Sequence, residues 1–306
     1  MQVPLLTSRR WLALGCLCAV GCGAAGGTDG GGAGLPDRGI VPYEKLAPVP
    51  DEDVDFLVPA GGNPAALVVD GAVELLYDDP EGIWHASVQA DGAVVDARLV
   101  RAGASGAAVA RWGDGFAIAW VEADAVVVAR GTAVDDLDAE PLATLPGASS
   151  PSVVVQGEAL LIYVTRDLAV DVHSLTADGA VSAAVRVLDS DADCIDEAED
   201  PCWDRMGVDD AEVRVARTAL GRTVFRMMYT GVGTSFNRGV GFAASFDGVA
   251  FNRYPFNPIF SESGRESQPS NVKLGNTYWL FFRDRVGNAE GLGYATIEVD
   301  SPSDQF

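Results

Sequence analysis

The chain has 306 residues, of which 48% are hydrophobic, and its 44 acidic side chains against 21 Lys and Arg give a formal net charge of −23 at pH 7. This apolar fraction over this length is sufficient for one large core. So negative a charge repels phosphate backbones, and nucleic acid is therefore not an expected partner.

Residues 1–21 have the layout of a bacterial secretory signal, with the basic pair Arg9-Arg10 before an apolar run from Trp11 to Val20. The tetrapeptide Ala-Val-Gly-Cys that ends at Cys22 resembles a lipobox, which implies cleavage before Cys22 and acylation of its thiol. The basic pair also resembles part of a twin-arginine signal. A plain signal peptide or an uncleaved anchor are the alternatives, although an apolar run of about ten residues is too short to span a bilayer. We expect an exported protein that is lipid-anchored in the bacterial envelope, at the periplasmic or surface face, with the lipid as its only membrane contact.

Residues 22–53 begin with a Gly-rich tract and are expected to form a flexible tether. Loss of Arg9 and Arg10 with the signal changes the formal charge from −23 to −25. No further linker is evident after residue 54, so residues 54–306 are predicted to be one domain.

One block recurs five times in this domain: a short apolar strand, a Gly-containing turn, and a stronger strand that ends in an aromatic residue. The copies begin at Ala65, Ala107, Pro151, Ala211 and Pro269. The aromatic residues that end the second strands are Tyr77, Trp120, Tyr163, Tyr229 and Phe282, with spacings of 43, 43, 66 and 53 residues. A third strand follows, and in several copies an Asp-Gly pair suited to a tight hairpin turn comes after it.

Such a repeat predicts an all-β fold, because a unit of three or four strands cannot bury both of its faces and must stack on others. Five units stacked radially make a five-bladed β-propeller. The fifth copy ends after its third strand, near Glu298, and we expect Val54–Val58 to complete that last blade. A two-sheet sandwich is the alternative, but it does not account for a fivefold repeat. We expect a monomer.

The segment between copies three and four is rich in acidic residues and contains Cys194 and Cys202, the two cysteines of the predicted domain. An even pair in an exported chain predicts a disulfide, with two free thiols as the alternative. Four aspartates have the offsets of positions one, three, five and twelve of a calcium loop: Asp189, Asp191, Asp193 and Asp200. The segment also resembles the Asp-rich repeats of the thrombospondin type 3 class, which implies Ca²⁺. A solvated acidic loop is the simpler interpretation.

The sequence gives little support for a Ser or Cys triad or for nucleotide chemistry. His85 and His173 are the only histidines, they occupy matching third strands, and we expect both to be half-buried strand residues. A Ser or Cys triad needs a histidine beside its nucleophile, so this pattern argues against one. No Gly-rich loop follows a strand and opens a helix, so nothing predicts nucleotide chemistry.

Residues 228–260 contain an aromatic strand, then Gly241-Phe242-Ala243-Ala244-Ser245, Asp247-Gly248, Phe251 and Asn257-Pro258. This pattern resembles blades of the five-bladed glycoside hydrolases, which include family 43 arabinanases and xylosidases, invertases, levansucrases and mannoside phosphorylases. The resemblance covers residues 209–298 and implies a sugar-hydrolase ancestry.

The resemblance also implies catalytic carboxylates where the innermost strands of the first three blades begin, facing the axis. This chain departs from that pattern: the corresponding positions are Asn63-Pro64, Ser105-Gly106 and Ser150-Pro151. An amide and hydroxyls cannot act as the acid and base of glycoside hydrolysis. Carboxylates do occur near the equivalent places in later units, and they are the candidate catalytic residues: Asp209, Asp210, Glu212 and Glu266. The candidate ligand-binding residues are Asn63, Trp84, Gln268 and Arg283.

These features lead to three hypotheses. The first is an envelope lipoprotein that binds a glycan or another envelope component without hydrolysing it. The second is an active glycoside hydrolase with a displaced carboxylate pair. The third is a scaffold for a protein partner, and Ca²⁺ is the one cofactor that any of them invokes.

Overall fold

The computed structural model describes residues 43–47, 56–190, 203–218, 220–234, 237–261 and 265–299. These residues belong to one compact unit, Arg38–Phe306. Throughout the described ranges the regular elements are β-strands. A helix long and apolar enough to cross a membrane is not found in this part of the chain.

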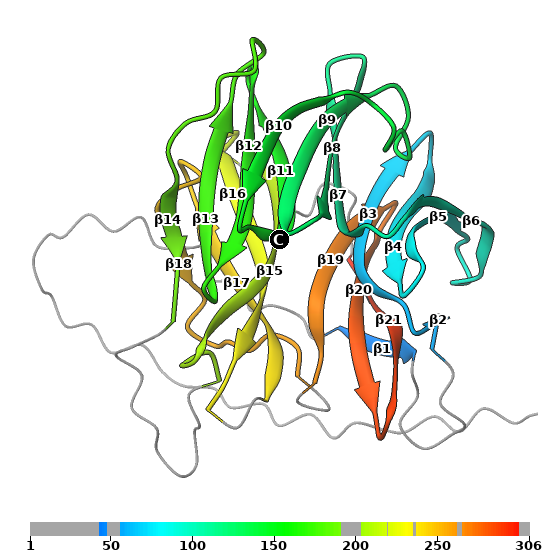
Figure 1. The fold of residues 1–306 in the computed structure, drawn as a ribbon. Helices are drawn as coiled ribbons and strands as arrows, with labels where there is room; N and C mark the ends of the chain where they lie inside the picture. The colour runs from blue at the N-terminus through cyan, green and yellow to red at the C-terminus, as the bar shows by residue number, and fades with distance from the viewer. Residues whose placement is uncertain are drawn as a thin grey trace, which may run out of the picture. The chain divides into compact units, whose positions relative to one another are not determined.

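Five sheets are arranged as blades around a central axis, which confirms the predicted five-bladed propeller (Figure 1). The first four blades are antiparallel meanders of four strands each. Blade 1 contains β3 (Gly62–Val69), β4 (Ala72–Asp79), β5 (Gly82–Val88) and β6 (Val94–Ala102). Blade 2 contains β7 (Ser105–Trp112), β8 (Gly115–Glu122), β9 (Ala125–Gly131) and β10 (Pro141–Pro146). Blade 3 contains β11 (Ser149–Gln156), β12 (Ala159–Arg166), β13 (Ala169–Leu175) and β14 (Val185–Leu188).

Blade 4 contains the stretch whose pattern resembles glycoside hydrolase blades. Its strands are β15 (Gly207–Arg217), β16 (Thr223–Val232), β17 (Arg238–Ser245) and β18 (Asn252–Arg253). The motif residues thus form the second and third strands, the turn and the outer strand of this blade, and Asn257-Pro258 follows that outer strand. Gly241 on β17 and Gly231 on β16 lie directly beneath Trp203, since a Cβ on either would come within 2.3 Å of its ring. Glycine is needed at both positions because the ring lies against the backbone.

Blade 5 contains β19 (Ser267–Leu274), β20 (Thr277–Val286) and β21 (Ala289–Glu298), and two N-terminal segments pair with its third strand. β1 (Glu44–Ala47) pairs antiparallel with β21 through Glu44 and Thr296, and β2 (Val58–Pro59) pairs with it through Val58 and Leu292. Closure of the last blade by the N-terminus is therefore confirmed. Val58 lies in the segment expected to close it, whereas β1 lies earlier, in the segment expected to be a tether.

The core is divided into five hydrophobic clusters, one between each pair of neighbouring blades. Each cluster takes side chains from the facing sides of two sheets, because successive residues of a strand point to opposite faces. The aromatic residues of the repeat all lie in these clusters: Tyr77, Trp120, Tyr163, Tyr229 and Phe282. Radial stacking is thus what buries both faces of every sheet.

Candidate functional site

A β-bulge opens the innermost strand of every blade. In blade 1, Gly62 pairs with Asp78 and Ala65 pairs with Leu76, so three residue steps on β3 oppose two on β4. The same shift recurs in the other four blades. The residue after the start of each bulge has a positive φ: Asn63 (45°), Gly106 (56°), Ser150 (46°), Asp210 (47°) and Gln268 (55°). Bulges re-aim side chains, and these five are turned toward one another around the axis.

A pocket on the axis is lined by residues of all five blades, including the five bulge residues. Its cavity volume is about 50 Å³, which is room for roughly three or four water molecules. Such a volume admits a substituent or one edge of a sugar ring, so a larger ligand would lie across the mouth of the pocket.

Asp210 is the one carboxylate among these five bulge residues. Its Oδ1 accepts a hydrogen bond from Ser150 Oγ at 2.8 Å, and its Oδ2 accepts one from Thr230 Oγ1 at 3.1 Å. Burial raises the pKa of Asp210 to about 7, and the charge of Asp209 adds to the shift, although Ser150, Arg238 and Thr230 oppose it. Asp210 can therefore be protonated near neutral pH and can then donate a hydrogen bond as well as accept one.

Asp78, at the end of β4, is a second buried carboxylate beside the ring, and it was not among the predicted site residues. Its Oδ2 accepts hydrogen bonds from Asn63 Nδ2 at 2.7 Å and from the Gly106 N–H at 2.9 Å. Burial raises the pKa of Asp78 above its ordinary value. The signal in the sequence was an aspartate directly after the aromatic Tyr77.

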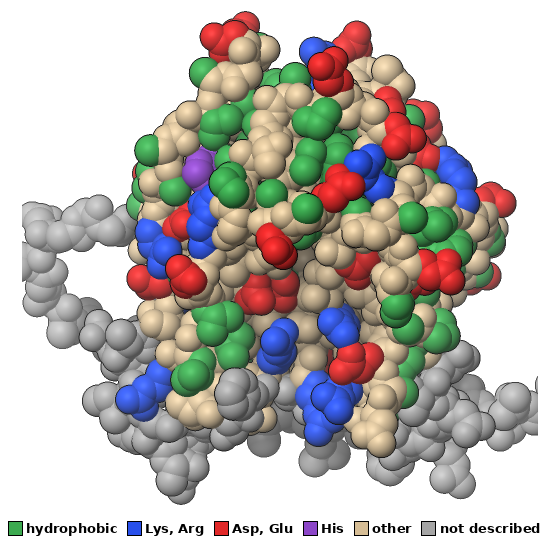
Figure 2. Space-filling view, in the orientation of Figure 1, with side chains coloured by type: hydrophobic (Ala, Val, Ile, Leu, Met, Phe, Trp, Pro, Cys, Tyr) green, Lys and Arg blue, Asp and Glu red, His purple; other side chains and the backbone are tan. Residues whose placement is uncertain are grey.

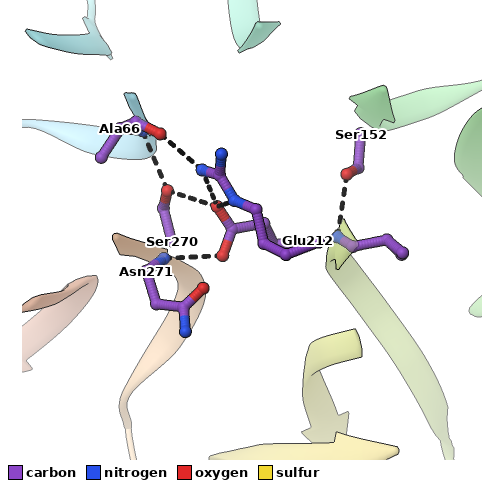
Figure 3. A network of polar contacts seen from close by, with 7 residues as sticks. Ala66, Ser152, Glu212, Ser270 and Asn271 are labelled. Atoms are coloured by element: carbon purple, nitrogen blue, oxygen red, sulfur yellow. Dashed lines mark hydrogen bonds and ion pairs between the residues drawn. The ribbon is translucent and has the colours of Figure 1, made fainter. Parts of the chain in front are cut away.

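Glu212 and Arg214, both on β15, join blade 4 to blades 5 and 1 (Figure 3). The Glu212 carboxylate accepts hydrogen bonds from Ser270 Oγ at 2.7 Å, from the Asn271 N–H at 2.6 Å and from Arg214 Nε at 3.0 Å. Arg214 also donates to the carbonyl oxygen of Ala66. Glu212 lines the pocket but its oxygens are engaged between blades, so its contacts are those of a structural residue.

The other two predicted catalytic carboxylates do not line the pocket. Asp209 Oδ1 accepts hydrogen bonds from the Asp210 N–H at 2.8 Å and from Ser150 Oγ at 3.3 Å. Glu266 is fully buried and contacts Lys45 Nζ at 3.2 Å. The structure therefore brings Asp209 and Asp210 together at Ser150 and places Glu266 in a separate ion-pair cluster.

Three of the four predicted ligand-binding residues lie around the pocket. Gln268 Oε1 accepts a hydrogen bond from the Asn63 N–H at 2.9 Å, and both residues line the pocket. A Cβ on Gly62 would lie 3.0 Å from Gln268 Oε1 and 3.4 Å from Arg283 Cδ, which places Arg283 beside them. Trp84 lies elsewhere, on β5, packed against the cluster between blades 5 and 1. His85 and His173 are buried on β5 and β13, and neither lines the pocket.

Most of the residues that were predicted to bind calcium, to form the disulfide or to carry the lipid lie outside the described residues. Asp191, Asp193, Cys194, Asp200 and Cys202 are not described, and the same holds for Cys22. Asp189 is described, and its carbonyl oxygen accepts a hydrogen bond from Arg253. In the ranges that the structure covers, no three His, Cys, Asp or Glu side chains are grouped to hold a metal ion.

No protein-family model matches the sequence, and no curated protein is similar to it. Solved structures are similar to the fold. A thermostable family 43 glycoside hydrolase matches with a TM-score of 0.60 at 12% identity, over 79% of this chain and 91% of the other. The fold is that of the five-bladed glycoside hydrolases.

Two family 62 enzymes extend this likeness to five-bladed glycoside hydrolases. The catalytic domain of the α-L-arabinofuranosidase of Coprinopsis cinerea matches with a TM-score of 0.60 at 10% identity, over 86% of this chain and 100% of the other. The α-L-arabinofuranosidase of Podospora anserina, solved in complex with cellotriose, matches with a TM-score of 0.58 at 8% identity, over 84% of this chain and 98% of the other. Identities this low establish the fold alone.

Proposed function

We propose that the propeller binds a glycan at its axial pocket and does not hydrolyse it. One observation carries this proposal: the bulge residues of blades 1, 2 and 3 are Asn63, Gly106 and Ser150. These are the positions at which the resemblance to glycoside hydrolases implies the catalytic carboxylates. An amide, a glycine and a hydroxyl leave hydrogen-bonding groups for a sugar but no acid and base pair.

The fold supports a sugar as the ligand, since one similar structure was solved in complex with cellotriose. The pocket has the composition of a polar recognition site, with an amide side chain at Gln268 and the carboxyl group of Asp210 both on its lining. A few polar groups that converge on one concavity are what fix the orientation of a bound ligand.

The test measures binding and cleavage on the same samples. Titration calorimetry of the purified protein against neutral and acidic oligosaccharides should detect saturable binding with a Kd below about 1 mM, and a reducing-sugar assay should detect no release. Gln268→Asn, which shortens the amide but suits a positive φ, should weaken binding by about tenfold. Glu158→Ala, in the exposed turn after β11, is the matched control. Absence of binding to every glycan would refute the proposal.

Hydrolysis is the second candidate, and Asp210 is the observation that favours it. A pocket carboxyl group with a pKa of about 7 is suited to protonate a leaving oxygen. A partner carboxylate is also required, and Asp209 and Asp78, which both lie beside the bulge residues, are hydrogen-bonded within the fold. Release of reducing sugar that Asp210→Asn abolishes would establish this candidate over simple binding.

The predicted lipid anchor gives the location that we propose for this activity. The lipobox-like residues before Cys22 support acylation at that cysteine, and a tethered propeller would then bind glycan at a membrane face. Metabolic labelling with palmitate, compared between the native chain and Cys22→Ala, tests it. An unlabelled native chain would overturn it.

A further inference from the structure

Four arginines gather at the end of the propeller where the innermost strands of blades 4 and 5 begin. Arg238 begins β17, Arg265 precedes β19, and Arg283 and Arg285 lie near the end of β20. Arg238 and Arg265 pair as a parallel bridge between blades 4 and 5, and Arg283 pairs with Ser267 at the start of β19. Figure 2 shows Lys and Arg side chains gathered beside the central hollow, over the ends of β19 and β20.

This arginine cluster (Arg238, Arg265, Arg283 and Arg285) has fewer carboxylate partners than cations. Arg283 and Arg285 share one carboxylate, that of Glu290, which Arg285 Nε approaches at 3.6 Å. Arg265 donates a side-chain hydrogen bond to the carbonyl oxygen of Gly287 at 3.5 Å, and among the described residues it has no ion pair. The guanidinium of Arg238 likewise has neither an ion pair nor a hydrogen bond in this part of the chain.

Such a cluster is unusual in this protein, where 44 acidic residues outnumber 21 Lys and Arg. Guanidinium groups close together repel one another unless an anion lies between them. The guanidinium group also matches carboxylate and sulfate oxygens geometrically, because its N–H groups form a planar fork that donates two parallel hydrogen bonds. The cluster therefore has the charge and the donor geometry of an anion-binding surface.

The arginine cluster also lies next to the axial pocket. Arg283 Cδ and Gln268 Oε1 both lie against the backbone of Gly62. Arg238 is close enough to Asp210 for its charge to lower the pKa of that carboxyl group against the effect of burial. Burial still raises the pKa of Asp210 to about 7, so this carboxyl group opposes an anionic ligand less than an exposed aspartate would.

We propose that the axial site is specific for an anionic glycan, whose carboxylate or sulfate groups lie against Arg238 and Arg265 while a neutral part of the sugar enters the pocket. This inference rests on the glycan-binding function proposed above and adds the chemical class of the ligand. The acidic remainder of the molecule does not prevent it, since at physiological ionic strength charges more than about 8 Å apart are largely screened.

The experiment compares ligands that differ only in charge. Polygalacturonate is titrated against its methyl ester, and dextran sulfate against dextran, which tests carboxylate and sulfate separately. One charged form should bind about tenfold or more tightly than its neutral match, and that preference should diminish as salt rises from about 50 to about 500 mM.

A double variant identifies the surface. Arg238→Gln with Arg265→Gln should lose about tenfold in affinity for the charged glycan and change binding of the neutral one less than about twofold. Arg238→Lys with Arg265→Lys should recover part of the loss. Arg111→Gln with Arg130→Gln, on blade 2, removes the same charge elsewhere and should have no effect. Equal thermal unfolding midpoints would show that all variants fold.

The two proposals fail in different ways. Binding of neither charged nor neutral glycans would refute the glycan function itself. Binding of the ester or of dextran as tightly as the charged form would refute only the anionic class, as would unchanged binding by the double glutamine variant. Equal binding of a single-stranded oligonucleotide would show that the cluster recognises anions other than glycans, and would likewise overturn the inference.

Discussion

The bulge residues show how one backbone feature sets the side chains around the axis. A positive φ is unfavourable for most side chains but is tolerated by glycine, asparagine and aspartate, and three of the five positions are Asn63, Gly106 and Asp210. Ser150 and Gln268 are the two bulge residues that lack this tolerance, and such backbone strain is concentrated at functional sites in proteins generally. At Asp210 the same geometry buries a carboxyl group.

Asp210→Asn should change how stability depends on pH. Because the pKa of Asp210 is raised from 3.8 to about 7 in the folded state, the native chain binds more protons than the unfolded chain between these values. Asp210 therefore makes its full contribution to the free energy of unfolding below about pH 4. That contribution decreases between pH 4 and 7 and is lost above pH 7. The asparagine variant should gain stability over the native chain by about 4 kcal/mol between pH 4 and 8.

Urea unfolding of both chains at several pH values measures this difference. Asp114→Asn, at an exposed aspartate, is the matched control and should follow the native curve. Parallel curves for Asp210→Asn and the native chain would contradict the assignment of a buried, proton-binding carboxyl group.

At the scale of the strand, register decides where a side chain points. Gly62 pairs with Asp78 in blade 1 and Ser149 pairs with Thr165 in blade 3, so Val164, not Tyr163, is equivalent to Tyr77. A shift of one residue turns a side chain to the other face of the sheet. Tyr163 accordingly packs between blades 3 and 4, whereas Trp120 and Phe282 pack against the preceding blade. The sequence repeat could not show this difference. Aligning the copies by residue type does not reveal which residues pair across neighbouring strands.

The strand β1 contributes a buried cation to blade 5. Lys45 Nζ contacts Asp284 Oδ2 at 2.7 Å and Glu266 Oε1 at 3.2 Å, and both carboxylate side chains are fully buried. Burial alone would lower the pKa of Lys45, but the two carboxylates raise it, so the ammonium stays charged. This contact fixes an N-terminal strand to residues more than 200 positions away.

Lys45→Met should destabilise the domain strongly, because it removes a charge that both buried carboxylates contact. Removing one member of a buried ion pair costs about 3–5 kcal/mol. A shift of the urea midpoint with an unchanged slope would measure it. Arg111→Gln, an exposed cation on β7, should shift the midpoint little. A Lys45→Met variant as stable as the native chain would show that β1 is not needed to complete blade 5.

Hydrogen bonds near the axis join blade 1 to blade 2, blade 3 to blade 4, blade 4 to blade 5 and blade 5 to blade 1. Asp78 accepts from Gly106 of blade 2, Ser150 donates to Asp210 of blade 4, and Ser152 Oγ accepts from the Val213 N–H at 2.9 Å. Ser270 Oγ accepts from the Ala66 N–H at 2.9 Å and donates to Glu212. Buried polar groups in these contacts are satisfied only when neighbouring blades are in place, so the propeller is expected to fold as a unit.

Ser270→Ala tests this closure. The change leaves the buried Ala66 N–H without its acceptor and removes one donor from Glu212, which should lower the free energy of unfolding by about 1–3 kcal/mol. Thermal unfolding should still be a single transition, since the remaining contacts join the same blades. Thr144→Ala, at an exposed site on β10, is the control. Two separate transitions in the native chain would contradict cooperative closure.

The sequence by itself determined the all-β class, the five repeats and the N-terminal closure of the last blade, because strands and turns follow local patterns of apolar residues, glycine and aspartate. It also located Asn63, Asp210 and Gln268 at strand starts, since the bulge recurs at one place in each repeat. Only the tertiary structure decided which of these residues meet. Asn63 and Gln268 are 205 positions apart yet share a hydrogen bond, and Glu266 pairs with Lys45 away from the pocket. Asp78 and Arg283 come to the axial region from second strands, and Arg238 comes from a third strand. Contacts across a closed ring depend on how the blades are placed around it, and a local sequence pattern does not determine that placement.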